Sequence, residues 1–147
     1  MKNLYIFILI ALQSFNNAYA QDSYRWRILD KQGEIKWDTQ SAKKINNEKV
    51  RFFYEYPYLE EQRNYLVKNK ILTRLEANSV LYGRMGVIAN CKTMEYGIFH
   101  STQLNSNRTP IAPPTSIPIN EVIFEFIMPD TEIELFVEDV CRYFKIK

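Results

Sequence analysis

The chain has little of what a metal site, a redox centre or a phosphate-binding loop requires. Its 147 residues include one histidine, His100, two cysteines and four glycines. A zinc site needs several His, Cys or carboxylate ligands at short spacing, and a phosphate loop needs clustered glycines. Cys91 and Cys141 do not form a Cys-x-x-Cys motif, which disfavours a redox pair. We therefore expect no metal and no cofactor.

A catalytic constellation is also absent from the sequence. Nucleophilic catalysis needs a base beside a Ser, Thr or Cys, and Ser101 follows His100. Neighbours on a strand point to opposite faces, so these two residues cannot form a dyad. Glu55, Glu60 and Glu61 lack the Asp-rich loop with a Gly turn that a calcium site requires, and we interpret them as a solvated charged edge. The sequence predicts that the protein is not an enzyme.

No excess of charge marks the chain. It holds 19 basic and 17 acidic residues, a net charge of +2. Binding to nucleic acid or to an anionic membrane surface calls for a strongly basic balance, so we expect neither partner. Four of the six prolines lie in Asn105–Pro118, which we expect to be an irregular loop.

The first twenty residues have the pattern of a secretory signal peptide. Lys2 gives a positive start, Leu4–Leu12 is an uncharged apolar run, and Ala18 and Ala20 are the small residues that a signal peptidase reads. We predict cleavage before Gln21. The nine-residue run is shorter than the roughly twenty residues of a membrane-spanning helix, and position 21 is not the cysteine of a lipoprotein. We expect an exported protein, periplasmic or extracellular, that is soluble and has no membrane anchor.

The predicted mature chain has the size of one domain. Removal of residues 1–20 leaves 127 residues with a net charge of +1, since Lys2 is the only charge in the leader. In an exported protein, two cysteines are first interpreted as a disulfide. A Cys91–Cys141 bond would close a loop of about fifty residues and restrict the unfolded chain by about 4 kcal/mol. Two buried free thiols are the alternative.

Alternating apolar and polar residues predict an antiparallel sheet. Turn residues between the first two segments indicate a hairpin, and a tight Lys92–Glu95 connection indicates another. Three glycines in the second hairpin, Gly83, Gly86 and Gly97, indicate bulges or strong twist. The predicted strands are Tyr24–Leu29, Ile35–Trp37, Val50–Tyr58, Val80–Cys91, Tyr96–Leu104 and Val122–Ile127.

Two further segments have helical features. Residues 60–78 favour a helix because Glu and Arg flank them and Gly and Pro are absent, although a hairpin around Lys68–Lys70 fits too. After Pro129, Asp130 or Thr131 can cap a C-terminal helix. Its apolar stripe, which we expect to face the sheet, is Ile133, Phe136, Val137, Val140, Cys141 and Phe144. The acidic residues that we expect to face solvent are Glu132, Glu134, Glu138 and Asp139.

An aromatic run on the third strand supplies the candidate binding surface. Phe52, Tyr54, Tyr56 and Tyr58 share one face of that strand, and we assign Phe52 and Tyr54 to the core. Tyr56 and Tyr58, near the strand end, either complete the core or remain partly exposed as a protein-binding patch. Arg108, the only charged residue in the Pro-rich loop, is the third candidate.

The chain resembles the surface-adhesin protein E family of small exported bacterial proteins. The resemblance covers about two-thirds of the mature chain and depends on the order of several short motifs. Ile35–Ser41, with Trp37 and Asp38, is similar to the family's early strand. The other motifs are Ser79–Cys91 ending in Asn90 and Cys91, the strand through His100–Leu104, the Pro-rich loop, and Met128–Thr131 leading to Val140–Tyr143.

The resemblance implies a Cys91–Cys141 disulfide and an antiparallel sheet backed by a helix. We predict an α+β domain over residues 21–147, with about five to six strands and a C-terminal helix. The resemblance also implies binding of host extracellular-matrix or plasma proteins. Since a fold does not determine a function, the alternative is a periplasmic structural or inhibitory accessory protein with a bacterial partner. The sequence does not predict an oligomeric state.

Overall fold

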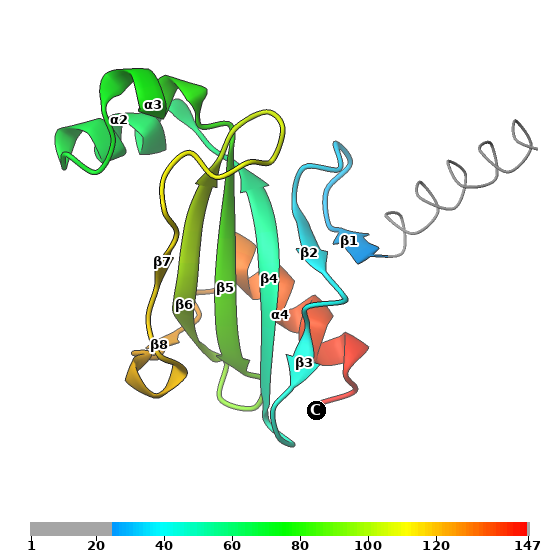
Figure 1. The fold of residues 1–147 in the computed structure, drawn as a ribbon. Helices are drawn as coiled ribbons and strands as arrows, with labels where there is room; N and C mark the ends of the chain where they lie inside the picture. The colour runs from blue at the N-terminus through cyan, green and yellow to red at the C-terminus, as the bar shows by residue number, and fades with distance from the viewer. Residues whose placement is uncertain (1–24, 147) are drawn as a thin grey trace, which may run out of the picture.

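An antiparallel sheet crosses the molecule, and the helix α4 (Glu132–Tyr143) lies behind it (Figure 1). The computed structural model describes residues 25–146, so the predicted leader, its cleavage site and Tyr24 lie outside the described residues. The strand order is β1-β2-β4-β5-β6-β7, with β3 also paired to β4 and β8 to β6. The prediction of an α+β fold with an antiparallel sheet and a C-terminal helix is confirmed.

Three long strands form the centre of the sheet: β4 (Lys49–Pro57), β5 (Tyr82–Asn90) and β6 (Glu95–Leu104). The register between β5 and β6 shifts between Gly86 and Val87, where the glycines predicted a bulge. The short strands are β1 (Trp26–Ile28), β2 (Lys36–Asp38), β3 (Lys43–Lys44), β7 (Thr115–Ser116) and β8 (Glu125–Phe126). Both predicted hairpins are present.

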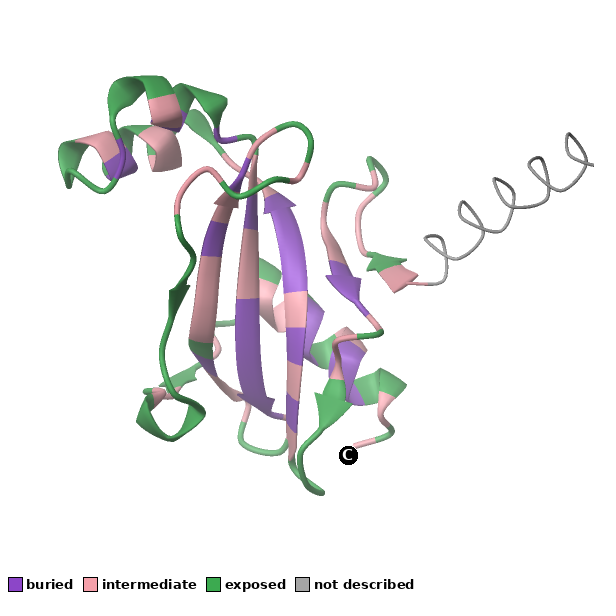
Figure 2. Cartoon of the chain, viewed as in Figure 1, coloured by how far each residue is buried: buried purple, intermediate pink, exposed green. Residues whose placement is uncertain are grey.

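Helix α4 packs its apolar stripe against one face of the sheet, where the buried residues gather (Figure 2). Phe136 is 0% exposed, and its ring centroid lies 4.2 Å from that of Tyr54 on β4. Near the other end of the helix Cys141 is bonded to Cys91, with their Cα atoms 5.7 Å apart. The predicted disulfide and the predicted core face of the helix are both confirmed.

Tyr56 belongs to this core, so the idea that it contributes to an exposed binding patch is wrong. Its side chain is 8% exposed and lies over Gly83, where a Cβ atom would overlap the ring. Burial raises the pKa of the Tyr56 hydroxyl above its ordinary value. Tyr58 is half-buried and stacks on Tyr56 with ring centroids 5.8 Å apart. Because Gly83 has no side chain, the Tyr56 ring fits over it. The alternating strand pattern alone did not show whether Tyr56 is buried or exposed.

Asp139 on α4 does not face solvent as predicted. It accepts hydrogen bonds of 2.8 Å from the Trp37 indole N–H and from the Arg27 guanidinium. Burial alone would raise the pKa of the Asp139 carboxyl, but the Arg27 and Trp37 hydrogen bonds outweigh it and lower that pKa below 3.8. This carboxylate therefore ties the helix to β1 and β2.

We expect Asp139→Asn to lower the free energy of unfolding by about 0.5–1.5 kcal/mol, because the Arg27 partner is half-exposed and solvent weakens the ion pair. The Asp139 carboxyl has a lower pKa in the folded chain than in the unfolded chain, so its ionised form stabilises the fold above about pH 4. This stabilisation is lost as the pH falls through the folded-state pKa of Asp139. Urea unfolding of both proteins between pH 2 and 7 tests this. The difference between them should shrink on acidification, and a constant difference would contradict the assignment.

Residues 60–79 form two helices rather than one helix or a hairpin. α2 (Glu60–Lys68) ends before Lys70, whose φ is 57°, and α3 (Arg74–Ser79) begins at a capping box between Thr73 and Glu76. The pair covers one end of the sheet around a small second core of Leu66, Leu72, Ala77 and Val80. No helix among residues 25–146 is long and apolar enough to cross a membrane.

The segment after β6 runs along the edge of the sheet. The predicted irregular loop includes the short strand β7, which pairs with β6, and a bridge between Leu104 and Pro110. The predicted strand 122–127 is strand only at β8, and a 3-10 helix, η1 (Ile119–Glu121), precedes it. Prolines at 110, 113, 114 and 118 prevent longer pairing because they lack an N–H donor.

Candidate functional site

The sheet has a second face, opposite α4, on which no helix of residues 25–146 packs (Figure 1). We call it the open face. Its side chains come from the strand positions that alternate with the core: Arg51, Phe53 and Glu55 on β4, Arg84 and Ile88 on β5, and His100 and Thr102 on β6. These residues combine charge and aromatic area, so the open face is the candidate functional site.

A buried carboxylate lies on this face near the end of β4. Glu55 is 1% exposed and accepts hydrogen bonds from Nε and Nη2 of Arg84, its register partner on β5. Lys36 Nζ is 3.8 Å and Arg108 Nη1 is 3.3 Å from the other carboxylate oxygen. The interpretation of Glu55 as part of a solvated edge is therefore wrong. A buried carboxylate requires such cationic partners.

Arg108 reaches Glu55 from the loop that follows β6. Asn105 closes this loop, because its side-chain oxygen accepts hydrogen bonds from the N–H groups of Asn107 and Thr109. Arg108 takes a left-handed conformation, with φ of 60°, which is unfavourable for a residue with a Cβ. Its guanidinium carbon lies 3.2 Å from the ring centroid of Tyr82. The loop thus holds the guanidinium flat on an aromatic ring and against Glu55.

His100 is the centre of a second polar group on the open face. Its Nδ1 is 2.7 Å from Ser116 Oγ on β7, and its Nε2 is 3.0 Å from Thr102 Oγ1. Burial, followed by the nearby charge of Arg84, lowers the pKa of the His100 ring below 6.5. Both ring nitrogens of His100 are within hydrogen-bond distance of hydroxyls. Sequence reasoning considered Ser101 and missed Ser116, because the pairing of β7 with β6 has no local signal.

Aromatic rings surround these polar groups. The Phe53 ring centroid lies 5.3 Å from those of Phe99 and His100, in edge-to-face contact. Gly86 permits this packing, since a Cβ there would overlap Phe99 and His100. At the other side Lys36 Nζ lies 4.8 Å from the Trp26 ring. Aromatic residues and arginines are enriched at protein interfaces.

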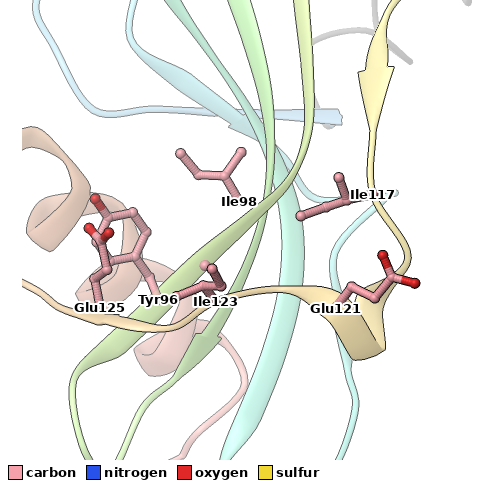
Figure 3. Close-up of a pocket in the computed structure, with 7 residues that line it drawn as sticks. Tyr96, Ile98, Ile117, Glu121, Ile123 and Glu125 are labelled. Carbon is pink, nitrogen blue, oxygen red and sulfur yellow. The ribbon is translucent and has the colours of Figure 1, made fainter.

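A hollow lies at the edge of β6, under the segment that runs past it (Figure 3). Its volume is about 220 Å³, and Ile98, Ile117 and Ile123 form its apolar walls, with Glu121 and Glu125 in its lining. Small-molecule sites usually hold at least about 300 Å³. Within residues 25–146 no three His, Cys, Asp or Glu side chains come together as a metal-ligand set. The hollow is therefore a poor candidate for a ligand site.

The three residues proposed from sequence as a binding surface do not form one patch. Tyr56 and Tyr58 stack on the α4 side of the sheet, whereas Arg108 lies on the open face. Only Arg108 is on the candidate site, and its side chain is 31% exposed. Sequence reasoning named Glu55 but assigned it to a solvated edge, and it missed Arg84, Tyr82 and Ser116. Arg84 could have been found only from the pairing register of β4 and β5, which places it opposite Glu55.

Comparison with known proteins gives a structural neighbour. No family model and no curated protein matches the sequence. The solved structure of Haemophilus influenzae protein E is similar to this chain with a TM-score of 0.50 and 16% sequence identity. The match covers 81% of this chain and 85% of that chain. This similarity extends over most of the sheet-and-helix fold.

Proposed function

We propose that this chain is an exported, non-enzymatic protein-binding module that recognises another protein through the open face of its sheet. The observation that carries the proposal is a sheet face without a packed helix that presents aromatic rings beside arginines. Tyr, Trp and Arg dominate binding energy at protein interfaces. Export follows from the predicted signal peptide.

The finer proposal is an adhesin-like partner, a host extracellular-matrix or plasma protein. The resemblance of the sequence to the surface-adhesin protein E family supports it, and the fold shared with protein E agrees with that resemblance. The alternative is a periplasmic structural or inhibitory role with a bacterial partner.

Binding experiments with a matched pair of charge-reversal variants test both proposals. Purified residues 21–147 are immobilised and exposed to matrix and plasma proteins and, separately, to periplasmic extract. Arg51→Glu changes the open face, whereas Glu138→Arg changes the exposed side of α4. We expect Arg51→Glu to reduce recovery of the partner and Glu138→Arg to leave it unchanged. Loss with Glu138→Arg alone would place recognition on the helix side and overturn the proposal.

The Ser116–His100 pair is the one observation that favours an enzyme. A histidine ring nitrogen 2.7 Å from a serine hydroxyl is close enough to accept its proton. In a catalytic triad a carboxylate then stabilises the imidazolium, but here Nε2 meets the Thr102 hydroxyl and Arg84 adds positive charge nearby. These surroundings therefore disfavour the protonated His100 ring that a catalytic serine would require.

We expect Ser116 to show no reaction with a fluorophosphonate probe, because its hydroxyl lacks a base that can hold a positive charge. Mass spectrometry of the native protein after incubation with the probe measures this, with heat-unfolded protein as the control for background labelling. A covalent adduct on Ser116 that disappears in the His100→Ala variant would instead support a hydrolase.

A further inference from the structure

We propose that Arg108, together with Arg84, forms the receptor for an acidic side chain of the protein partner. The inference depends on the proposed function of the open face as a protein-binding surface. It names the chemistry that this face recognises: a carboxylate on a segment that also carries apolar side chains.

Arg108 has donors that the fold does not use. Its guanidinium donates no hydrogen bond to any of residues 25–146, and its Nη1, although buried, meets Glu55 only as an ion pair at 3.3 Å. Because Nη1 is enclosed against Glu55, an acceptor from a partner would reach the guanidinium through its other nitrogens, which can still donate. About a third of the Arg108 side chain is exposed, which leaves access for that acceptor.

The local charge favours an anion. Arg84 and Arg108 both contact the single carboxylate of Glu55, which leaves a net positive charge on this group. Both arginine side chains are about two-thirds covered, so water screens this charge less than it would at a fully exposed site. A carboxylate that binds here would form charge-assisted and potentially bidentate hydrogen bonds.

The site is also held in place before any partner binds. Stacking on Tyr82, the left-handed backbone at Arg108 and the turn closed by Asn105 fix the loop. A buried ion pair is weak evidence for stability, since apolar side chains of equal size usually stabilise as well. We infer that Glu55 positions the two arginines, and a preorganised guanidinium loses less entropy on binding.

The surroundings favour a protein segment over a polyanion. Sulfated polysaccharides and nucleic acids select extended basic surfaces, whereas this chain has nearly balanced charge, 19 basic against 17 acidic residues. Tyr82, Phe53 and Phe99 offer apolar area on the same face. A single acidic residue flanked by apolar residues matches this combination.

Two peptides that differ only in charge test the inference. ¹⁵N-labelled residues 21–147 are titrated with acetyl-Phe-Glu-Phe-amide and, as the matched control, with acetyl-Phe-Gln-Phe-amide, and the arginine Nε–H signals are followed by NMR. We expect the glutamate peptide to shift the signals of Arg108 and Arg84 saturably. We expect the glutamine peptide to bind about tenfold more weakly, because a charge-assisted hydrogen bond is replaced by a neutral one.

Matched variants separate the arginine receptor from the rest of the face. Arg108→Gln should abolish the preference for the glutamate peptide, and Tyr82→Leu, which keeps the charge but removes the stacking ring, should weaken it. Arg142→Gln removes an exposed arginine of α4, outside the open face, and should leave the preference unchanged. Each variant's melting curve is recorded first, and Tyr82→Leu serves as the test if Arg108→Gln does not fold.

The outcomes distinguish the inference from the proposed function. If both peptides bound equally well and shifted the NMR signals of open-face residues, the carboxylate receptor would be overturned, but the proposal that the open face binds protein would remain. Shifts confined to α4 signals would overturn both. A heparin oligosaccharide is titrated in parallel, and tighter Arg108-dependent binding of heparin than of the glutamate peptide would overturn the choice of a protein carboxylate.

Discussion

Replacing Phe136 with alanine should lower the free energy of unfolding by about 3–5 kcal/mol, as is typical when a buried aromatic side chain is removed. The Phe136 ring is fully buried between α4 and β4 and packs on Tyr54. The neighbouring core residues Val137 and Val140 are fixed by the same helix and cannot fill the space that the ring leaves. The loss therefore combines the lost burial with a cavity.

Leu135 provides the matched control for this measurement. It lies next to Phe136 on α4 but is 57% exposed, so Leu135→Ala should change the free energy of unfolding by less than about 1 kcal/mol. Urea unfolding of both variants gives the comparison. If Phe136→Ala unfolded at the same urea concentration as the parent protein, the core face of α4 would be wrongly assigned.

The spacing of apolar residues predicts much of this fold, because a helix or strand with one buried face must repeat its apolar residues at the helical or strand period. The stripe on α4 repeats every three to four residues and meets the sheet as expected, and the alternation in β4 marks Phe52 and Tyr54 as core. Cys141 lies on that stripe, and its pairing with Cys91 is expected from the two cysteines of an exported chain and from the family resemblance. These features need no knowledge of strand register.

The candidate site depends on the register in which the strands pair. The sequence around each residue does not show that register. Glu55 has the sequence context of a surface glutamate, but β5 places Arg84 opposite it and a distant loop adds Arg108. Tyr56 is buried because Gly83 happens to face it, and Ser116 meets His100 because a two-residue strand pairs with β6. Contacts between elements decide these positions.

The two faces of the sheet therefore have separate physical roles. The α4 side provides the apolar burial that stabilises the domain, whereas the charged cluster on the open face contributes little net stability. Substitutions on the open face that keep the partners of Glu55 can consequently change recognition while the fold remains intact, whereas removal of a Glu55 partner leaves a buried charge unpaired and destabilises the fold. This separation makes the binding tests interpretable.

Removing the disulfide is expected to have the second large effect on stability. The bond joins residues 50 apart, and the restriction of the unfolded chain by such a loop amounts to about 4 kcal/mol. Measured losses of native disulfides in small secreted domains are about 2–5 kcal/mol. We therefore expect the Cys91→Ala/Cys141→Ala double variant to melt well below the parent protein. Alanine is preferred to serine because Cys141 is buried and a serine hydroxyl there would lack a partner.

Reduction gives the control for this variant. A reducing agent should lower the melting temperature of the parent protein and leave that of the double variant unchanged. Hydrogen exchange locates the effect. Because the bond restricts the unfolded chain, its removal should lower the protection of the slowest amides of β4, β5 and β6, which exchange by global unfolding, by the same free energy as unfolding itself. Loss confined to the last turn of α4, near Cys141, would instead mean that the bond acts only locally on the folded helix.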